Sequence, residues 1–364
     1  FRNWMENTVG ERPVILDTSI TSASCREMEK YLGNIGYFYS KVRYEVSYRK
    51  RSNKAHQTYI VSPSTPYRIR NFNYEVEDPE LAAWIMKGRR NVLVKPGDIY
   101  NVYELDEERE RLTRFLNDNG YYGFVKDYIF FEVDSALGNK ELDIFMKVKG
   151  VNQPADSSGV FTSGKHYRYK IDKVVVLPNY DPSDPATNSP PFDTLVEKVH
   201  QIRKDVPANF YYILYKNKLR INPNILTQTI HIEDDEPFNL RDVDETRKGF
   251  GYLSIYNYTN ISFREVEPPM YINDSITFKR LECRINLQRT PVHQYSIEAE
   301  GTNSGGDLGI GGNISYRNRN IFRNGETFQV KLRGAMEAQR SNQDDAEDQQ
   351  TFLFFNTFEW GVEA

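Results

Sequence analysis

The sequence lacks the long apolar runs that membrane-spanning helices need. No stretch of about 18 consecutive apolar residues occurs, which excludes a transmembrane helix, although an alternating strand would escape that test. Cysteine is scarce as well: Cys25 and Cys283 are the only two, and each falls on the apolar side of its expected element. This placement favours two buried free thiols over a disulfide.

Recognisable reaction or cofactor chemistry is also missing. The sequence contains no G-x-S-x-G elbow and no G-x-x-x-x-G-K-[ST] phosphate loop, and its five histidines are too far apart for a local metal-ligand pair. We expect these histidines to lie on the surface or in turns: His56, His166, His200, His231 and His293. The acidic residues at 344–348 favour a solvated loop over a cation site. We therefore predict no catalytic residue, no cofactor, no metal and no enzyme activity.

The charge balance gives little sign of a partner. The net charge is −4, which argues against a nucleic-acid surface, and the aromatic content of 13% favours β structure. A short basic stretch with Lys50, Arg51 and Lys54 is read as a solvated hairpin tip rather than a binding patch. A partner must be sought in the arrangement of the elements.

Residues 105–133 contain one supersecondary unit that recurs along the chain. Asp106 is expected to cap a short amphipathic helix, Gly120 to end it in the left-handed conformation, and residues 129–133 to alternate as a strand. A second copy has a capping box at Ser24 and the sequence Gly-Tyr-Phe from Gly36, which matches Gly-Tyr-Tyr from Gly120. A third, weaker copy covers residues 238–265. The fold is thus expected to be built from repeats.

The repeats divide the chain into four expected parts. The first is an N-terminally incomplete unit at residues 1–66, with strands near 42–46 and 58–61. Residues 67–150 should follow the order β-α-α-β-β, with a helix starting at Asp78-Pro79-Glu80. Residues 166–289 should form a further unit, interrupted by an inserted helix and hairpin, and residues 290–364 a sheet. A polar linker at 151–165 should be the softest joint.

The first strands of the second and third units share an irregularity. Tyr67 and Ile69 have one parity and Phe72 and Tyr74 the other, and the same slip occurs in residues 169–176. A β-bulge at the same place in both strands is the simplest cause.

From residue 292 apolar and polar residues alternate over long strands. Residues 308–316 and 328–336 each place apolar side chains on one face, and residues 352–362 form a further stripe. Strands of this length, with connections that are short and long by turns, are typical of a transmembrane β-barrel. A soluble antiparallel sheet with one wet face fits the alternation equally well.

At this point the residues resemble a known family. Tandem β-α-α-β-β units with a Leu-x-x-x-Gly-Tyr-Tyr helix end resemble POTRA (polypeptide-transport-associated) domains. Residues 311–326, GGNISYRNRNIFRNGE, resemble the first barrel hairpin of the BamA/TamA outer-membrane assembly family, the bacterial surface antigens. Residues 300–303, EGTN, are most similar to the segment before that hairpin in TamA-like lipoproteins.

The resemblance implies an α+β fold of tandem POTRA repeats followed by the first antiparallel strands of an outer-membrane β-barrel. It implies location in the bacterial outer membrane, with the POTRA part in the periplasm. Expected partners are client outer-membrane or exported polypeptides, outer-membrane lipid and an inner-membrane or periplasmic partner subunit. A closed barrel needs more strands than these, and no acylated N-terminal cysteine is present, so we expect the chain to be a fragment.

Two functions from different classes remain open at the level of sequence. The first is an assembly or translocation factor that binds clients by β-augmentation, because an extended polypeptide can add to an open sheet edge. The second is a periplasmic or surface module that binds glycan or protein in a formed pocket. In the family fold the second strand of each unit is the edge. The expected client-binding residues are Arg43, Tyr44, Tyr48, Tyr128, Phe130, Glu132, Ser262 and Arg264. The expected barrel seam consists of Tyr295, Ser296, Ile297 and Glu298.

Overall fold

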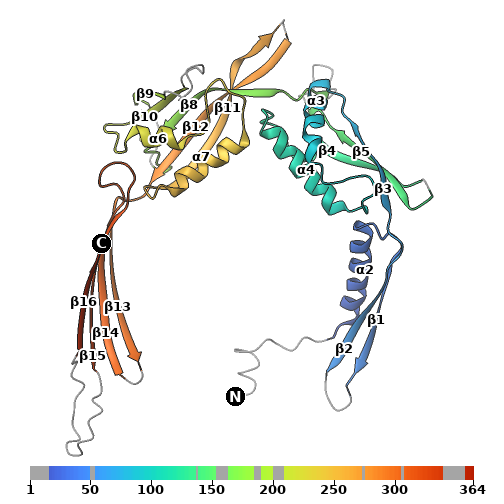
Figure 1. The fold of residues 1–364 in the computed structure, drawn as a ribbon, viewed down its shortest axis with the longest axis horizontal. Helices are drawn as coiled ribbons and strands as arrows, with labels where there is room; N and C mark the ends of the chain where they lie inside the picture. The colour runs from blue at the N-terminus through green and yellow to red at the C-terminus, as the bar shows by residue number, and fades with distance from the viewer. Residues whose placement is uncertain are drawn as a thin grey trace, which may run out of the picture. The chain divides into compact units, whose positions relative to one another are not determined.

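The computed structural model has a mixed α+β fold with several separate β-sheets (Figure 1). Two compact units make up the chain, Phe1–Asn117 with Gly123–His166, and Asp118–Tyr122 with Tyr167–Ala364. Within the described residues, no helix is both long enough and apolar enough to cross a membrane. The structure describes residues 16–49, 54–136, 138–152, 163–183, 190–199, 209–272, 275–304, 307–338 and 357–364.

The first unit opens with helix α2 (Thr18–Asn34), followed by the antiparallel strands β1 (Lys41–Tyr48) and β2 (Ala55–Ser62). The predicted helix start at Ser24 is wrong. Asp17 caps the helix instead, accepting a hydrogen bond from the Ser19 amide at 2.8 Å, and the Ser24 hydroxyl bonds back to the Ile20 carbonyl. An aspartate upstream provides an equally good cap, so the helix begins nearly two turns earlier.

The remainder of the first unit follows the element order predicted for residues 67–150. Strand β5 lies in the middle of a three-stranded sheet, parallel to β3 and antiparallel to β4. The elements are β3 (Arg68–Glu75), α3 (Pro79–Gly88), the 3-10 turn η2 (Arg89–Asn91), α4 (Val102–Asn117), the 3-10 turn η3 (Lys126–Tyr128), β4 (Ile129–Asp134) and β5 (Glu141–Val148).

One of the two predicted helix starts in this part is confirmed. Asp78 caps α3, with Pro79 at the first helical position and the Glu80 amide 2.9 Å from the Asp78 Oδ1. The predicted cap at Asp106 is wrong, because Asn101 accepts from the Tyr103 amide at 3.0 Å and α4 begins at Val102. Asp106 lies one turn inside the helix. The short side chain of Asn101 competes as a cap in the same way as aspartate.

The second unit contains a five-stranded sheet in the order β11-β12-β8-β10-β9. The predicted insertion is the hairpin β9–β10 with the short helix α6. Strand β10 runs parallel to β8 and occupies the edge that β8 would otherwise expose. The elements are β8 (Arg168–Leu177), β9 (Asp193–Val199), β10 (Asn209–Tyr215), α6 (Pro223–Thr229), α7 (Leu240–Tyr252), β11 (Tyr256–Ile272) and β12 (Ser275–Arg289).

The predicted irregularity in the first strands is confirmed. The β3–β5 register shifts between Ile69 and Asn71, so that Arg70 has no partner residue in the ladder. The β8–β12 register likewise omits Asp172. Each omitted residue forms an ion pair with the neighbouring strand, Arg70 with Asp143 and Asp172 with Arg280. The bulge therefore turns one charged side chain per strand toward a partner of opposite sign.

The predicted linker at 151–165 is described at its two ends. Its two ends pair as the short strands β6 (Val151–Asn152) and β7 (Ser163–Gly164), while residues 153–162 lie outside the described part. The softness of this joint stays a prediction.

The chain continues into an antiparallel four-stranded sheet in the order β13-β14-β15-β16. The strands contain 12, 12, 11 and 7 residues. They are β13 (His293–Ser304), β14 (Asp307–Asn318), β15 (Phe328–Ala338) and β16 (Thr357–Glu363).

The repeated glycine-aromatic motif connects each helix end to the strand that begins the next repeat. Gly36 and Gly120 have positive φ, +89° and +101°, as predicted. The Gly36 carbonyl accepts from the Tyr67 amide at 2.9 Å, and the Gly120 carbonyl accepts from the Tyr169 amide at 2.8 Å. In each case the aromatic residue two places after the glycine packs on the tyrosine whose amide donates to that glycine: Phe38 packs on Tyr67, and Tyr122 packs on Tyr169. The repeat in sequence is therefore a repeated joint in structure.

Candidate functional site

The most distinctive surface is one face of the sheet β13–β16. Antiparallel partners point to the same face, and the register aligns Ile297 with Ile314, Ile314 with Leu332, and Leu332 with Val362. The alternation in each strand therefore places apolar residues in continuous rows across the sheet. We call this surface the apolar face; its members include Tyr295, Ile297, Leu308, Ile310, Ile314, Tyr316, Val330, Leu332, Met336, Phe358, Trp360 and Val362.

The apolar face is uncovered. Ile297 is 80% exposed, Trp360 85% and Leu332 51%, whereas the core of the five-stranded sheet holds residues such as Ile285 at 0%. Burying an aliphatic side chain of this size contributes about 1.5–3 kcal/mol. Exposed patches of this kind mark surfaces that meet another protein or a membrane.

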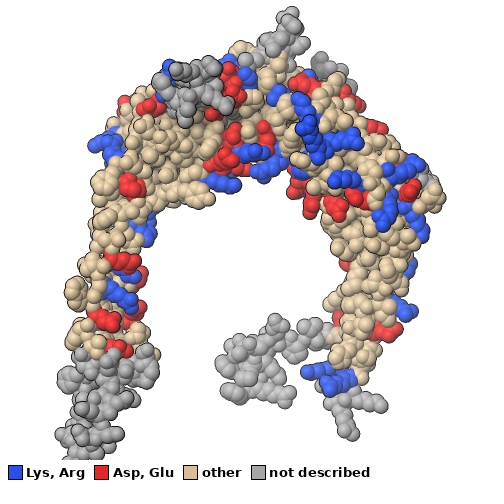
Figure 2. All heavy atoms as spheres, in the orientation of Figure 1, with Lys and Arg blue, Asp and Glu red and all other residues tan. Residues whose placement is uncertain are grey.

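The opposite face of the same sheet is polar. Arg333 pairs with Glu300 at 3.2 Å, the Asn313 amide donates to Glu298 at 2.9 Å, and Arg317 donates to Gln329. Figure 2 shows the charged side chains of this sheet gathered toward one of its sides. A sheet with an uncovered apolar face and a hydrogen-bonded polar face is suited to stand between lipid and water.

The expected seam residues lie on β13, which pairs with β14 on one side only in the described part of the chain. Tyr295 and Ile297 belong to the apolar face, and Ser296 and Glu298 to the polar face. The ladder continues beyond Gly301 to the Ser304–Asp307 pair without a register shift. The glycine at 301 therefore does not interrupt the pairing. The seam role of these residues stays a prediction.

The expected client-binding residues of the first unit are already engaged within it. β4 is an edge strand, but Tyr128 precedes it in η3, where its ring packs on His166 with centroids 4.6 Å apart. The edge strand was expected to run from Lys126 to Val133, but it begins at Ile129, because the 3-10 turn η3 occupies Lys126–Tyr128. Phe130 lies under the Lys149 ammonium at 5.1 Å, and Glu132 pairs with Lys147 at 2.6 Å.

The other two expected edges differ in how open they are. Among the described strands, β1 pairs with β2 alone; Arg43 faces Ile60 and Tyr44 faces Tyr59. Tyr48 is 73% exposed. β11 is the edge of the five-stranded sheet and pairs with β12 over most of its length, with a break in the ladder between Val266 and Met270. On β11, Arg264 pairs with Glu282 at 3.1 Å, and the Ser262 hydroxyl lies 3.5 Å from the Arg284 carbonyl.

The structure corrects the reading of one histidine. His166 is buried, its Nε2 lies 2.8 Å from the Lys149 carbonyl, and burial lowers its pKa. The expectation of a surface position is therefore wrong, because Phe124 and Tyr128 form an aromatic pocket around the ring. Both cysteines are buried free thiols, as predicted. No group of metal-ligating side chains occurs among the described residues.

Within the second unit, a set of hydrogen bonds holds the sheet β13–β16 to the part that contains α6 and α7, and sequence reasoning did not find it. The connection from β14 to β15, residues 319–327, contacts the end of α7 and the segment before α6. The Asn222 amide donates to the Arg323 carbonyl at 2.8 Å, the Asn320 side chain donates to the Arg220 carbonyl at 2.8 Å, and Ser254 bonds Thr327 at 2.6 Å. The Asn-rich composition of residues 317–325 was the available signal.

Comparison with known proteins gives structural neighbours only. No family model and no curated protein matches the chain. BamA from Haemophilus ducreyi lacking POTRA domains 1–3 is 13% identical, with a TM-score of 0.38, over 74% of this chain and 42% of that one. BamA POTRA3–5 from Haemophilus influenzae is 11% identical, with a TM-score of 0.35, over 76% and 84%. CdiB from Acinetobacter baumannii is 12% identical, with a TM-score of 0.29, over 90% and 48%.

The chain thus spans less than half of the BamA chain from Haemophilus ducreyi. At identities and TM-scores of this size, neither the family nor the activity of this chain follows from the neighbours.

Proposed function

We propose that the chain belongs to an outer-membrane protein assembly or translocation factor of the POTRA-containing type. In this proposal residues 1–66, 67–150 and 166–289 are periplasmic POTRA units, and residues 290–364 are the first strands of a β-barrel. The observation that supports it best is the apolar face of β13–β16. The binding partners are outer-membrane lipid on this face and client polypeptides on open strand edges.

The dimensions of the apolar face suit a membrane. From Leu308 to Tyr316 the stripe runs about 27 Å along β14, at about 3.4 Å per residue. The apolar band of outer-membrane barrels is about 25 Å tall, with aromatic residues at its borders. Tyr295 and Tyr316, with ring centroids 5.2 Å apart, lie at the end of the stripe nearest the β14–β15 connection. They would form part of such a border.

The alternative of a soluble glycan- or protein-binding module explains the sheet less well. A soluble sheet with one wet face buries its apolar side against other elements. Here no described element covers the apolar side, and Tyr295 is 73% and Trp360 85% exposed.

Lipid contact can be tested in the full-length gene product, reconstituted in vesicles. Single cysteines are placed on the apolar face, Ile314→Cys or Leu332→Cys, and labelled with an environment-sensitive fluorophore. The matched controls on the polar face are their chain neighbours, Ser315→Cys and Lys331→Cys. Quenching by doxyl-labelled lipid is expected at positions 314 and 332 but not at 315 and 331. Equal quenching on both faces, or none on either, would reject the proposal.

Client binding by β-augmentation is the finer part of the proposal. β13 and β4 each have one side without a paired strand among the described strands, and main-chain hydrogen bonds can hold clients of many sequences there. Cysteines introduced as Ser296→Cys and Glu298→Cys should crosslink to the terminal strand of a stalled client. Crosslinks only to the protein's own strands, while clients still assemble, would contradict templating at this seam.

A further inference from the structure

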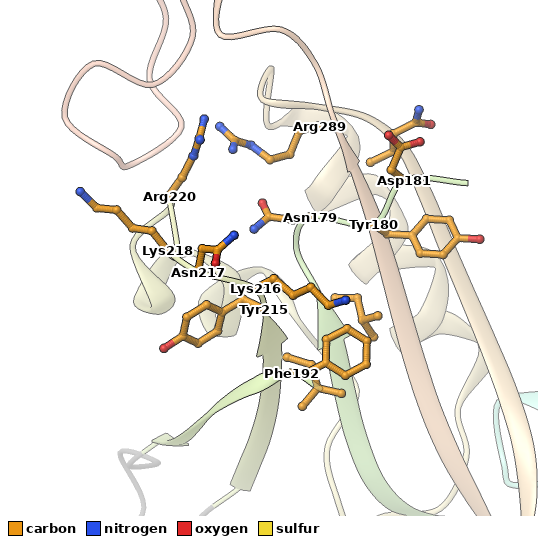
Figure 3. Close-up of a pocket in the computed structure, with 13 residues that line it drawn as sticks. Asn179, Tyr180, Asp181, Phe192, Tyr215, Lys216, Asn217, Lys218, Arg220 and Arg289 are labelled. Atoms are coloured by element: carbon orange, nitrogen blue, oxygen red, sulfur yellow. The ribbon is translucent and has the colours of Figure 1, made fainter. Parts of the chain in front are cut away.

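A cationic cavity of about 360 Å³ opens at one end of the five-stranded sheet in the second unit (Figure 3). Its walls come from the segment after β8, the segment after β10 and the end of β12. Among the described residues, four cationic side chains and one carboxylate, that of Asp181, line it; the cationic ones are Lys216, Lys218, Arg220 and Arg289. Figure 2 shows Lys and Arg side chains gathered over the end of β10. The volume is in the range of small-ligand sites.

Three of these four cationic side chains have no ion-pair partner among the described residues: Lys218, Arg220 and Arg289. The buried Nε of Arg289 also has no hydrogen-bond partner there. Burial lowers the pKa of Arg289; the nearby Tyr256 raises it in part, and the charge of Arg220 lowers it. Figure 3 shows these two guanidinium groups close to each other. Like charges at one cavity, with a buried donor left over, favour binding of an anion.

The position of the cavity narrows the choice of anion. Arg289 is the last residue of β12, and β13 begins at His293, so the chain enters the apolar face directly after the cavity wall. The Arg220 carbonyl also accepts from Asn320 in the β14–β15 connection at 2.8 Å. The cavity therefore lies beside the end of the sheet that carries Tyr295 and Tyr316. A lipid with its chains on the apolar face would have its headgroup at this level.

We propose that this cavity binds the phosphodiester headgroup of an anionic phospholipid. The inference rests on the proposed function, since it takes β13–β16 to lie in a membrane. Arg220 and Arg289 hold the phosphate oxygens, because a guanidinium can donate two parallel hydrogen bonds to a phosphate. Lys218 adds charge at the exposed side. A zwitterionic headgroup fits poorly, since among the described residues of the lining only Asp181 is acidic, and its carboxylate already accepts from the Ser183 amide at 2.9 Å.

The test uses the whole chain in an uncharged detergent and short-chain phospholipids added below their micelle concentration. Calorimetric titration compares dihexanoyl phosphatidylglycerol, dihexanoyl phosphatidylcholine and inorganic phosphate. The variant Lys218→Gln/Arg220→Gln changes exposed side chains and leaves the Arg220 carbonyl in place, so it is expected to fold. The matched control, Arg247→Gln/Lys248→Gln, removes the same charge from the exposed side of α7.

Phosphatidylglycerol should bind the unchanged chain more tightly than phosphatidylcholine. Its affinity should fall about tenfold or more in the Lys218/Arg220 variant, because each basic residue near an anionic headgroup contributes separately. The Arg247/Lys248 control should bind as the unchanged chain does. Equal affinity for the two phospholipids, or an unchanged affinity in the Lys218/Arg220 variant, would overturn the inference. Inorganic phosphate binding as tightly as phosphatidylglycerol would also overturn it and would assign the cavity to a soluble anion.

This assay needs no bilayer. If the chain does not bind the headgroup but lipid still quenches the fluorophores at positions 314 and 332, this inference alone is rejected. If the headgroup binds but lipid quenches neither position, the proposed function is rejected.

Discussion

The joint at Gly36 allows a quantitative test of how consecutive repeats are held together. Gly36 has φ of +89°, and a Cβ added there would lie 2.8 Å from the Tyr100 carbonyl oxygen and 2.9 Å from Ile99 Cγ2. Gly97 is a matched control in the same unit. Its φ is +97°, but a Cβ there would have no atom within 4 Å. The two glycines therefore share the backbone conformation and differ only in the surroundings.

The expected costs follow from this difference. Alanine in the left-handed region costs about 1–2 kcal/mol, and reduced freedom of the unfolded chain returns about 0.4–1 kcal/mol. Gly97→Ala should therefore destabilise the first unit by about 1 kcal/mol. Gly36→Ala carries the same cost plus the displacement of a backbone carbonyl, and forced overpacking of this kind costs about 1–3 kcal/mol more. A total of about 2–4 kcal/mol is expected for Gly36→Ala.

Urea denaturation followed by the fluorescence of Trp84 reports on this unit, because Trp84 lies in α3. Trp4 and Trp360 are replaced by phenylalanine in all samples so that no other tryptophan contributes. If Gly36→Ala costs no more than Gly97→Ala, the close approach of the Tyr100 carbonyl does not exist in solution. The joint would then be looser than the structure shows.

Three further outcomes test the interior of the two units. Glu108 is fully buried and accepts from the Leu93 amide at 3.1 Å and from Arg111 at 2.7 Å. Glu108→Ala should therefore lower the free energy of unfolding in urea by about 3–5 kcal/mol. The control Glu107→Ala, on the exposed side of α4, should change it by less than about 0.5 kcal/mol. Burial, with the Glu245 carboxylate nearby, raises the pKa of Asp242 from 3.8 to about 6, so folding stability should fall as pH rises through this interval. Asp242→Asn should then be more stable than the unchanged chain at pH 7.5 by about 1–2 kcal/mol, after allowance for partial exposure, and no more stable at pH 4; equal stability at both pH values would contradict the assignment. Burial also raises the pKa of the Cys283 thiol, so maleimide labelling followed by mass spectrometry should modify Cys283 only after denaturation.

Local signals in the sequence predicted local features of the fold well. The parity slip between Ile69 and Phe72 predicted the bulge at Arg70, because a two-residue side-chain period makes any insertion visible in the sequence. The glycines at 36 and 120 were predicted to end helices for an equally local reason, their freedom to adopt positive φ. Helix starts were less predictable. Several capping residues lie within two turns of each other, and the structure uses Asp17 and Asn101 instead of Ser24 and Asp106.

Features that combine distant segments could not be read in this way. The alternation in β13–β16 predicted two unlike faces, but only the exposure of residues such as Ile297 distinguishes an uncovered apolar face from one covered by protein. The cationic cavity is lined by Asp181, Lys218 and Arg289, which lie at the ends of three strands that are distant in sequence. Its charge is invisible in a chain with a net charge of −4. The basic residues lie at one end of the five-stranded sheet, and the apolar face begins a few residues later in the chain. Only register and topology show that the two lie side by side, so a headgroup site could not be inferred from the sequence.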